Sequence, residues 1–212
     1  RAAVEGGASL QGTTLEDGTT SLKITTHKAV KWTNVAVDST VYEHPTANPT
    51  RLKFKAAGDY FLSLTAPIYE GTVTNWGHRN NHEFVVFKNG TKVDTGATRS
   101  MYMRHYNDNG YGFHKDTSGH INVLLTGIAV DDYVEIKVKR CNTNMSNDMT
   151  LQTTSMYVEK IAAGRTVFSG TATRTVSNTN LNGNASGLQW TSVRKDGGFT
   201  HSNSSNNHEI TL

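Results

Sequence analysis

The chain repeats part of its own sequence once, at a spacing as long as a domain. Val30–Phe54 and Leu188–Leu212 align without a gap at an offset of 158 residues. A unit of this length can bury a core of its own, unlike the short units of solenoids and propellers. The repeat therefore indicates a modular protein. The matched pairs are Trp32 with Trp190, Thr33 with Thr191, Val35 with Val193, Asn48 with Asn206, Leu52 with Ile210, Phe54 with Leu212, Leu10 with Phe168 and Gly12 with Gly170.

The offset divides the chain into one complete unit and the opening of a second. We expect an N-terminal strand or linker region over residues 1–21, a domain over residues 22–163 and a partial second repeat over residues 164–212. The partial repeat would leave an open sheet edge and half a core. We expect it to add strands to a neighbouring chain, as in β-strand addition, or to fold with residues beyond Leu212. The sequence leaves both alternatives open.

Alternation of apolar and polar residues predicts strands throughout. The clearest examples are Tyr60–Leu64, Glu83–Phe87 and Met156–Ile161, and no segment keeps a helical period. Asn89-Gly90 between two alternating segments predicts a hairpin. We also expect Ile121–Leu125 and Tyr133–Lys139 to pair with each other across the turn that separates them. Many short strands with turns between them indicate an all-β sandwich.

Composition excludes several classes of protein. No apolar run approaches the length of a membrane span, and the net charge of +3 is spread along the chain rather than gathered in a basic tract. Membrane spans and nucleic-acid binding are therefore not expected. The single cysteine, Cys141, follows a predicted strand, so we interpret it as a strand-end thiol rather than a nucleophile.

The order of motifs from residue 22 to residue 161 resembles the complement C1q globular head family, whose members share the fold of tumour necrosis factor. Arg51–Leu64 (RLKFKAAGDYFLSL) is similar to the segment that leads into the family's central strand. His82–Val93 is similar to its strand ending in Lys-Asn-Gly. Ile121–Val138 resembles the pair of strands that follows, and Met156–Ile161 the closing strand.

This resemblance implies a ten-stranded jelly roll, followed here by the first strands of a second copy. It also implies a homo-oligomer, commonly a compact trimer, with no catalytic residues and no cofactor. The collagen-like stalk that often precedes the domain in animals is absent, because the sequence has no Gly-X-Y period. A sequence rich in Thr, Asn and Gly without disulfides suits the related modules of bacterial and phage surface proteins better.

We find no constellation of residues that predicts an enzyme. His78 and His82 are four residues apart but lie in a segment predicted as loop and strand, so we interpret them as solvated histidines rather than zinc ligands. Asn107, Asp108 and Asn109 supply oxygens that calcium prefers but lack a later Glu, which favours a turn. Asp131-Asp132 is interpreted as the turn before a strand.

The sequence therefore predicts a structural or adhesive module of an extracellular assembly. We expect a phage fibre or capsid-decoration protein, or a bacterial surface filament, located on a virion or cell surface. Its partners would be copies of itself and other surface proteins. The residues of the partial repeat that would serve assembly are Trp190, Val193, Phe199, Ile210 and Leu212.

The alternative is a carbohydrate- or receptor-binding domain with an aromatic loop. Aromatic rings stack on sugars and supply large contact areas at low entropic cost. The same rings could instead pack at the end of the jelly roll or between subunits. The candidate residues are Trp76, Tyr102, Tyr106, Tyr111 and Phe113.

Overall fold

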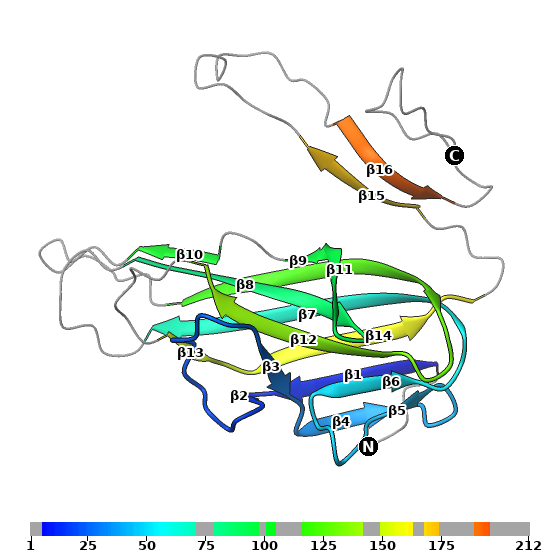
Figure 1. Ribbon diagram of the computed structural model, residues 1–212, viewed down its shortest axis with the longest axis horizontal. Coiled ribbons are helices and arrows are strands. Elements are labelled where there is room, and N and C mark those ends of the chain that lie inside the picture. The colour runs from blue at the N-terminus through cyan, green and yellow to red at the C-terminus, as the bar shows by residue number, and fades with distance from the viewer. Residues whose placement is uncertain are drawn as a thin grey trace, which may run out of the picture. The chain divides into compact units, whose positions relative to one another are not determined.

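The computed structural model describes residues 6–70, 79–97, 101–104, 116–141, 149–162, 168–173 and 189–195. The chain divides into two compact units, Arg1–Ile161 and Ala162–Leu212. The described residues form strands and turns only, and they include no helix that could cross a membrane. The first unit is a sandwich of two antiparallel sheets (Figure 1).

The first sheet has the strand order β11-β7-β14-β1-β4, with β13 also paired to β7. The second sheet has the order β10-β8-β12-β3-β2, with β6 paired to β12 and β5, and β9 paired to β8. In the first sheet the strands are β1 (Gly7–Gly12), β4 (Asn34–Val37), β7 (Gly58–Glu70), β11 (Asp116–Ile128), β13 (Met149–Leu151) and β14 (Thr154–Lys160). In the second they are β2 (Thr14–Leu15), β3 (Lys28–Lys31), β5 (Tyr42–Glu43), β6 (Arg51–Phe54), β8 (Arg79–Lys88), β9 (Thr91–Ala97), β10 (Met101–Arg104) and β12 (Tyr133–Arg140).

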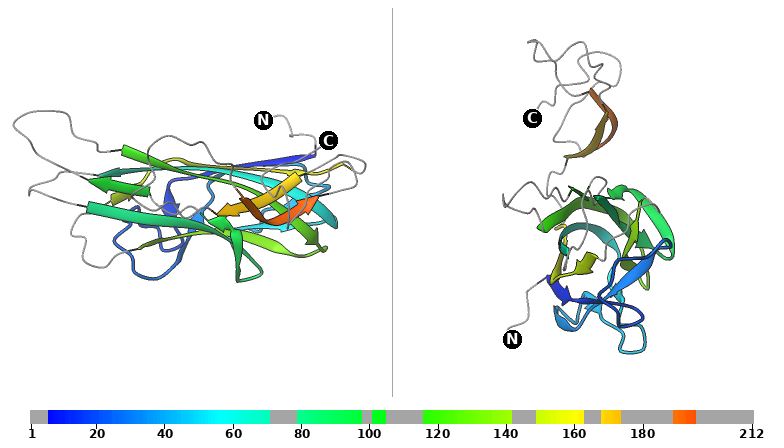
Figure 2. Two further views of the ribbon diagram at one scale, coloured as in Figure 1. Left: turned by 90° about the horizontal axis from the view of Figure 1, so that it is seen from above. Right: turned by 90° about the vertical axis from the view of Figure 1, so that its left-hand side faces the viewer.

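This strand order is that of a jelly roll, which confirms the predicted fold class. The long strands β7, β8, β11, β12 and β14 alternate between the two sheets, so the chain crosses the core at successive connections. Seen end-on, the strands curl around the core (Figure 2). The core is one cluster of inward side chains from both sheets. Its largest members include Trp32, Tyr42, Phe54 and Tyr60, all at most 2% exposed.

Two expectations about local structure are corrected. Ile121–Leu125 and Tyr133–Lys139 do not pair with each other, because β11 pairs with β7 in the first sheet while β12 pairs with β8, β6 and β3 in the second. Residues 69–82 and 101–119, which we expected to be long loops, are also partly strand: β7 runs on to Glu70, and β10 begins at Met101. The hairpin predicted at Asn89-Gly90 is confirmed, since Lys88 pairs with Thr91.

The N-terminal strands belong to both sheets. β1 lies between β14 and β4 in the first sheet, and β2 then pairs with β3 in the second. The crossing point is Gly12, where an added Cβ would lie 2.1 Å from the carbonyl oxygen of Lys31. Glycine is required there because the backbones approach too closely for any side chain.

The second unit contains β15 (Phe168–Thr173) and β16 (Gln189–Lys195), which pair with each other in antiparallel orientation. At the offset of 158, β15 corresponds to residues 10–15 and β16 to residues 31–37, segments that also pair in the first unit. Leu10 pairs with Val35 there, whereas Phe168 pairs with Lys195. The pairing is thus shifted by two residues from Phe168 to Thr171, and by one residue at Ala172 and Thr173, beyond an irregularity in the register.

Candidate functional site

The outer face of the first sheet carries few charged side chains, and none of them is in its central rows. Every second residue of its strands is buried, as in the pattern of β7, so the residues between them face outward. We call this surface the neutral face: among the described residues its outward positions hold no Lys or Arg, and its three carboxylates, Asp59 of β7, Asp116 of β11 and Glu159 of β14, lie near strand ends. Its other members are Ser9 and Gln11 of β1; Phe61, Ser63, Thr65, Pro67 and Tyr69 of β7; Ser118, His120, Asn122 and Leu124 of β11; and Ser155 and Tyr157 of β14.

The register aligns these side chains in rows across the strands. Asn122, Ser63, Tyr157 and Ser9 form the central row, since each is the register partner of the next. Tyr157 is 37% exposed, which makes it one of the most exposed large side chains in the described part of the chain. The central row therefore offers hydroxyl and amide groups around a single exposed ring.

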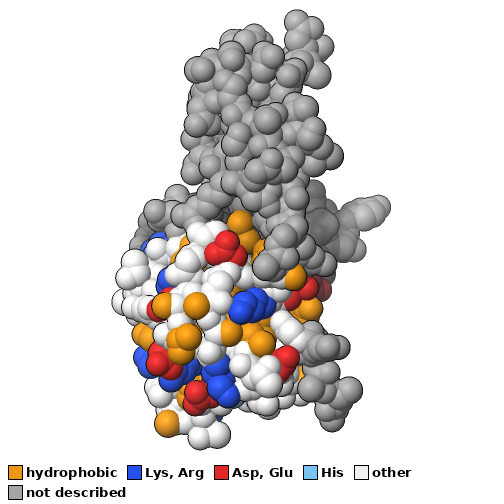
Figure 3. Space-filling view, turned by 90° about the vertical axis from the view of Figure 1, so that its right-hand side faces the viewer, with side chains coloured by type: hydrophobic (Ala, Val, Ile, Leu, Met, Phe, Trp, Pro, Cys, Tyr) orange, Lys and Arg blue, Asp and Glu red, His pale blue; other side chains and the backbone are white. Residues whose placement is uncertain are grey.

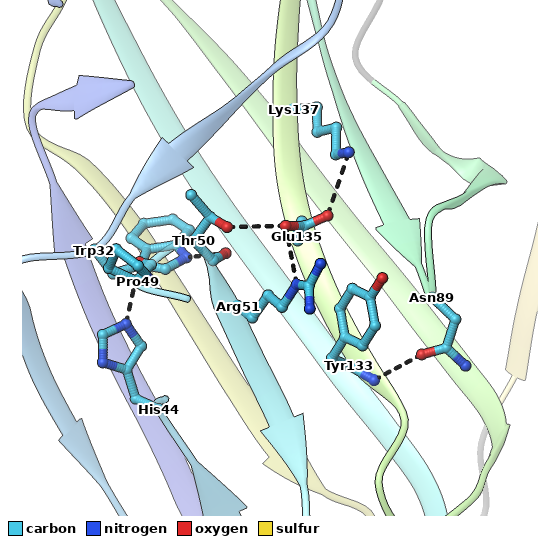
Figure 4. Close-up of polar contacts among 9 residues, drawn as sticks. All are labelled: Trp32, His44, Pro49, Thr50, Arg51, Asn89, Tyr133, Glu135 and Lys137. Carbon is cyan, nitrogen blue, oxygen red and sulfur yellow. Dashed lines mark hydrogen bonds and ion pairs between the residues drawn. The ribbon is translucent and has the colours of Figure 1, made fainter. Parts of the chain in front are cut away.

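The outer face of the second sheet is charged instead, and its ions are paired. Glu135 of β12 is 6% exposed. It accepts a hydrogen bond from the Thr50 hydroxyl at 2.8 Å and lies 3.4 Å from Arg51 Nε and 3.3 Å from Lys137 Nζ. Figure 4 shows these side chains converging on the carboxylate, and the Arg51 guanidinium lies 4.1 Å above the ring of Tyr133. A partner that bound here would have to displace or desolvate these pairs.

A second carboxylate on the same face, Glu83 of β8, is arranged in the same way. Burial opposes its ionisation, but Lys139 at 3.2 Å, together with Lys92 and His27, lowers its pKa. His27 Nε2 lies 3.4 Å from Glu83, yet burial of the ring and the charge of Lys139 lower the pKa of His27. We therefore regard this contact as one between a neutral ring and a carboxylate at neutral pH.

Replacing Glu135 with alanine is expected to destabilise the first unit by about 2 kcal/mol, because a buried hydroxyl and two partly exposed cations lose their carboxylate partner. Glu43→Ala is the matched control: Glu43 is half exposed and lies 3.9 Å from Lys53, so its loss should change stability little. Urea unfolding of both variants measures the difference. Equal effects of the two substitutions would contradict the role assigned to Glu135.

The sandwich contains a buried polar cluster where β7 ends and β8 begins. Glu70, Asn80 and His82 are each 1% exposed, and Asn80 Nδ2 donates to Glu70 Oε1 at 3.4 Å. The Leu22 carbonyl accepts from His82 Nε2 at 3.0 Å, so Nδ1 is the unprotonated nitrogen of the neutral ring. Burial lowers the pKa of His82 to about 4, with a further contribution from Arg140.

His82 is therefore not a solvated loop histidine, and that interpretation is wrong for this residue. The reason is that β8 starts at Arg79 and its alternation turns His82 inward. Among the described residues no three His, Cys, Asp or Glu side chains come together as a metal site. His78 lies outside the described residues.

Asp132 joins two turns at the opposite end of β8 from His82. Its carboxylate accepts from Asn89 Nδ2 at 2.6 Å and from the Ala129 amide at 2.9 Å, and it pairs with Lys88 at 2.8 Å. Burial opposes ionisation, but these contacts lower the pKa of Asp132. The turn predicted at Asp131-Asp132 is confirmed, and Asp131 has a positive φ of 71°.

The chain has few detectable relatives by sequence. No family model matches it, and no curated protein matches it. It is similar to solved structures: murine APRIL at pH 8.5 is 12% identical, with a TM-score of 0.40 over 72% of this chain and 98% of that one. The globular domain of zebrafish complement 1qA protein is 12% identical, with a TM-score of 0.42 over 74% of this chain and 97% of that one.

The first unit is a jelly roll by its own strand order. The jelly roll that the sequence resemblance implied is thus present in this chain. None of these comparisons identifies a site residue.

Most residues singled out from the sequence lie outside the described part of the chain. These are Trp76, Tyr106, Tyr111 and Phe113 of the aromatic set, Asn107, Asp108 and Asn109 of the weak calcium candidate, and Phe199, Ile210 and Leu212 of the assembly set. Tyr102 is placed in β10, and Trp190 and Val193 in β16, by their backbones alone. Cys141 is exposed and follows β12.

One side of the first unit shows no concentration of one charge among its described residues. From the side drawn in Figure 3, hydrophobic, basic and acidic side chains of the described residues are interspersed. Such a mixed surface gives no field that would attract a polyanion. The neutral face is thus the surface with the most distinctive chemistry.

Proposed function

We propose that the chain is a non-enzymatic structural module that assembles with copies of itself through the neutral face. The observation that carries this proposal is the contrast between the two outer faces. The central rows of the neutral face hold no charged residue and its three carboxylates lie near strand ends, whereas the face around Glu83 and Glu135 carries paired ions. Interface cores are depleted of charge and enriched in aromatic residues, so the neutral face suits association better.

The energetic reason is desolvation. Ions removed from water cost several kcal/mol each unless they are paired well. Hydroxyl and amide side chains such as Ser63 and Asn122 lose less, and they can regain hydrogen bonds with a partner. Burying the exposed ring of Tyr157 adds a hydrophobic contribution.

The setting that we propose is an extracellular assembly, such as a phage fibre, a capsid decoration or a bacterial surface filament. The internal repeat supports it, because domain-sized units in tandem form elongated arrays. A trimer is the oligomer that the sequence resemblance implies. The neutral face of each subunit would then face the molecular axis.

The test is a charge placed in the central row. Tyr157→Arg should convert the wild-type oligomer toward monomer, with a dissociation constant at least about tenfold higher, because like charges from each copy meet in the interface. Analytical ultracentrifugation over a concentration series measures this. Tyr157 is exposed, so the fold should tolerate the substitution.

The matched control is Thr91→Arg, which adds the same charge at an exposed position of β9 in the second sheet. It should leave the oligomer unchanged. A wild-type chain that sediments as a monomer at high concentration contradicts the proposal. So does an oligomer that survives Tyr157→Arg but dissociates in Thr91→Arg.

A further inference from the structure

The hairpin between β8 and β9 contains an Asn-Gly dipeptide, Asn89-Gly90. This dipeptide is chemically labile, because a glycine does not shield its own amide nitrogen from the preceding side chain. A Cβ added at Gly90 would meet only the Tyr133 hydroxyl, at 3.9 Å, so the surroundings do not shield the Gly90 amide nitrogen either. The sequence has two more such dipeptides, Asn109-Gly110 and Asn182-Gly183.

Two hydrogen bonds hold the Asn89 side chain in place. Its Oδ1 accepts from the Tyr133 amide at 2.9 Å, and its Nδ2 donates to Asp132 Oδ1 at 2.6 Å. The backbone is in the left-handed region at both turn residues, with φ of 49° at Asn89 and 79° at Gly90. Both ends of the carboxamide are thus bound to the neighbouring turn. The side chain therefore cannot rotate freely to bring Cγ toward the Gly90 nitrogen.

We propose that Asn89 is a deamidation site and that Asp132 restrains its reaction. In the reaction the Gly90 nitrogen attacks Asn89 Cγ and loses its proton. The Cγ–Nδ2 bond breaks, and ammonia leaves with that proton. Water then opens the cyclic imide to aspartate or isoaspartate. No electrons are transferred, and water is the only co-reactant.

The two hydrogen bonds act in opposite directions on this step. The Tyr133 amide polarises the carbonyl that is attacked and stabilises the negative charge that develops on Oδ1. The Asp132 carboxylate binds the leaving nitrogen in its ground-state position and opposes the rotation needed for attack. Loss of Asp132 would thus remove the restraint and leave the activating contact.

The product would disturb the turn that it forms in. An aspartate at position 89 faces the carboxylate of Asp132 without the amide donor that now joins them, and like charges at this distance repel. Isoaspartate also adds a methylene to the backbone of a two-residue hairpin, whose dihedral angles the strands fix. Deamidation should therefore loosen the link between the β8–β9 hairpin and the start of β12.

The experiment is storage of the full chain at mildly alkaline pH followed by peptide mapping for Asn89. The Asn89 side-chain amide should be lost up to about tenfold faster in Asp132→Ala than in wild type, because one hydrogen bond to a charged acceptor is removed. Asp132→Asn keeps an oxygen acceptor for Nδ2 and should stay close to wild type. A synthetic peptide spanning Val86–Val93 gives the rate of amide loss without the fold. That rate should exceed the rate in the wild-type protein.

Asp38→Ala controls for general destabilisation. Asp38 makes similar turn contacts, with Thr40 and Gly6, and neither contact involves Asn89 or Asp132. It should not accelerate loss of the Asn89 amide. The proposal is overturned if Asp132→Ala reacts no faster than wild type or if Asp38→Ala accelerates the loss equally. It is also overturned if wild type reacts as fast as the peptide.

Discussion

Replacing Gly12 with alanine is expected to destabilise the first unit by about 3 kcal/mol or more. The added Cβ would lie 2.1 Å from the Lys31 carbonyl oxygen, and the obstacle is backbone that is itself held in β3. The sheets must separate or β1 must shift, and either change breaks the pairing of β1 with β14 or that of β2 with β3. Urea unfolding followed by tryptophan fluorescence measures the loss, since Trp32 is buried in the core.

Gly18→Ala is the matched control for Gly12→Ala. Gly18 has a positive φ of 82°, and nothing lies within 4 Å of an added Cβ, so only backbone strain of about 1 kcal/mol is expected. The two glycines thus separate a steric requirement from a conformational one. A Gly12→Ala variant as stable as Gly18→Ala would show that the backbone at Gly12 does not pass close to the Lys31 carbonyl.

Acid is expected to destabilise the first unit through His82. The pKa of His82 is about 4 in the fold, below its ordinary value of 6.5, because burial disfavours the charged ring. The contribution of the neutral His82 ring to the unfolding free energy is therefore complete above pH 6.5, and it is lost as the pH falls toward 4. Its size is up to about 3 kcal/mol, from a shift of this magnitude.

The measurement is the unfolding free energy of wild type and His82→Gln as a function of pH. Glutamine does not titrate, so the advantage of the wild type should shrink between neutral pH and pH 4. His120→Gln is the control, because it makes the same substitution at an exposed ring on the neutral face. Parallel profiles for wild type and His82→Gln would refute the assignment, and an NMR titration of the ring measures the pKa directly.

The sequence predicted the strands well where one face is buried. β7 and β14 alternate strictly, so their inward residues and their lengths follow from the period of two. Asn89-Gly90 and Asp131-Asp132 identify turns because few residues adopt a positive φ. These local rules suffice for elements but not for their pairing.

Strand pairing was harder to predict because neighbours in sequence are not neighbours in a jelly roll. The short connection between β11 and β12 suggested a hairpin, yet it spans the core from one sheet to the other. The same limit applies to function. The neutral face is built from four strands spread over residues 9–159, and only their register brings Ser63, Asn122 and Tyr157 into one row.

The polar cluster was missed for a related reason. His82 reads as a loop residue when β8 is assumed to begin near residue 83, and a difference of a few residues at a strand end decides whether it points inward. A signal was available in the alternation, since Asn80 and His82 continue the inward positions of Phe84 and Val86.

The place of β1 beside β14 determines how the first unit would respond to tension. Gly7 pairs with Glu159, and Lys160 donates to the Gly6 carbonyl, so the ends of the unit leave the sandwich side by side. A force applied through both ends pulls these antiparallel strands apart from their open end. The hydrogen bonds then carry the load one after another rather than together. A string of such units would extend at low force by peeling, and would act as a compliant tether rather than a stiff rod.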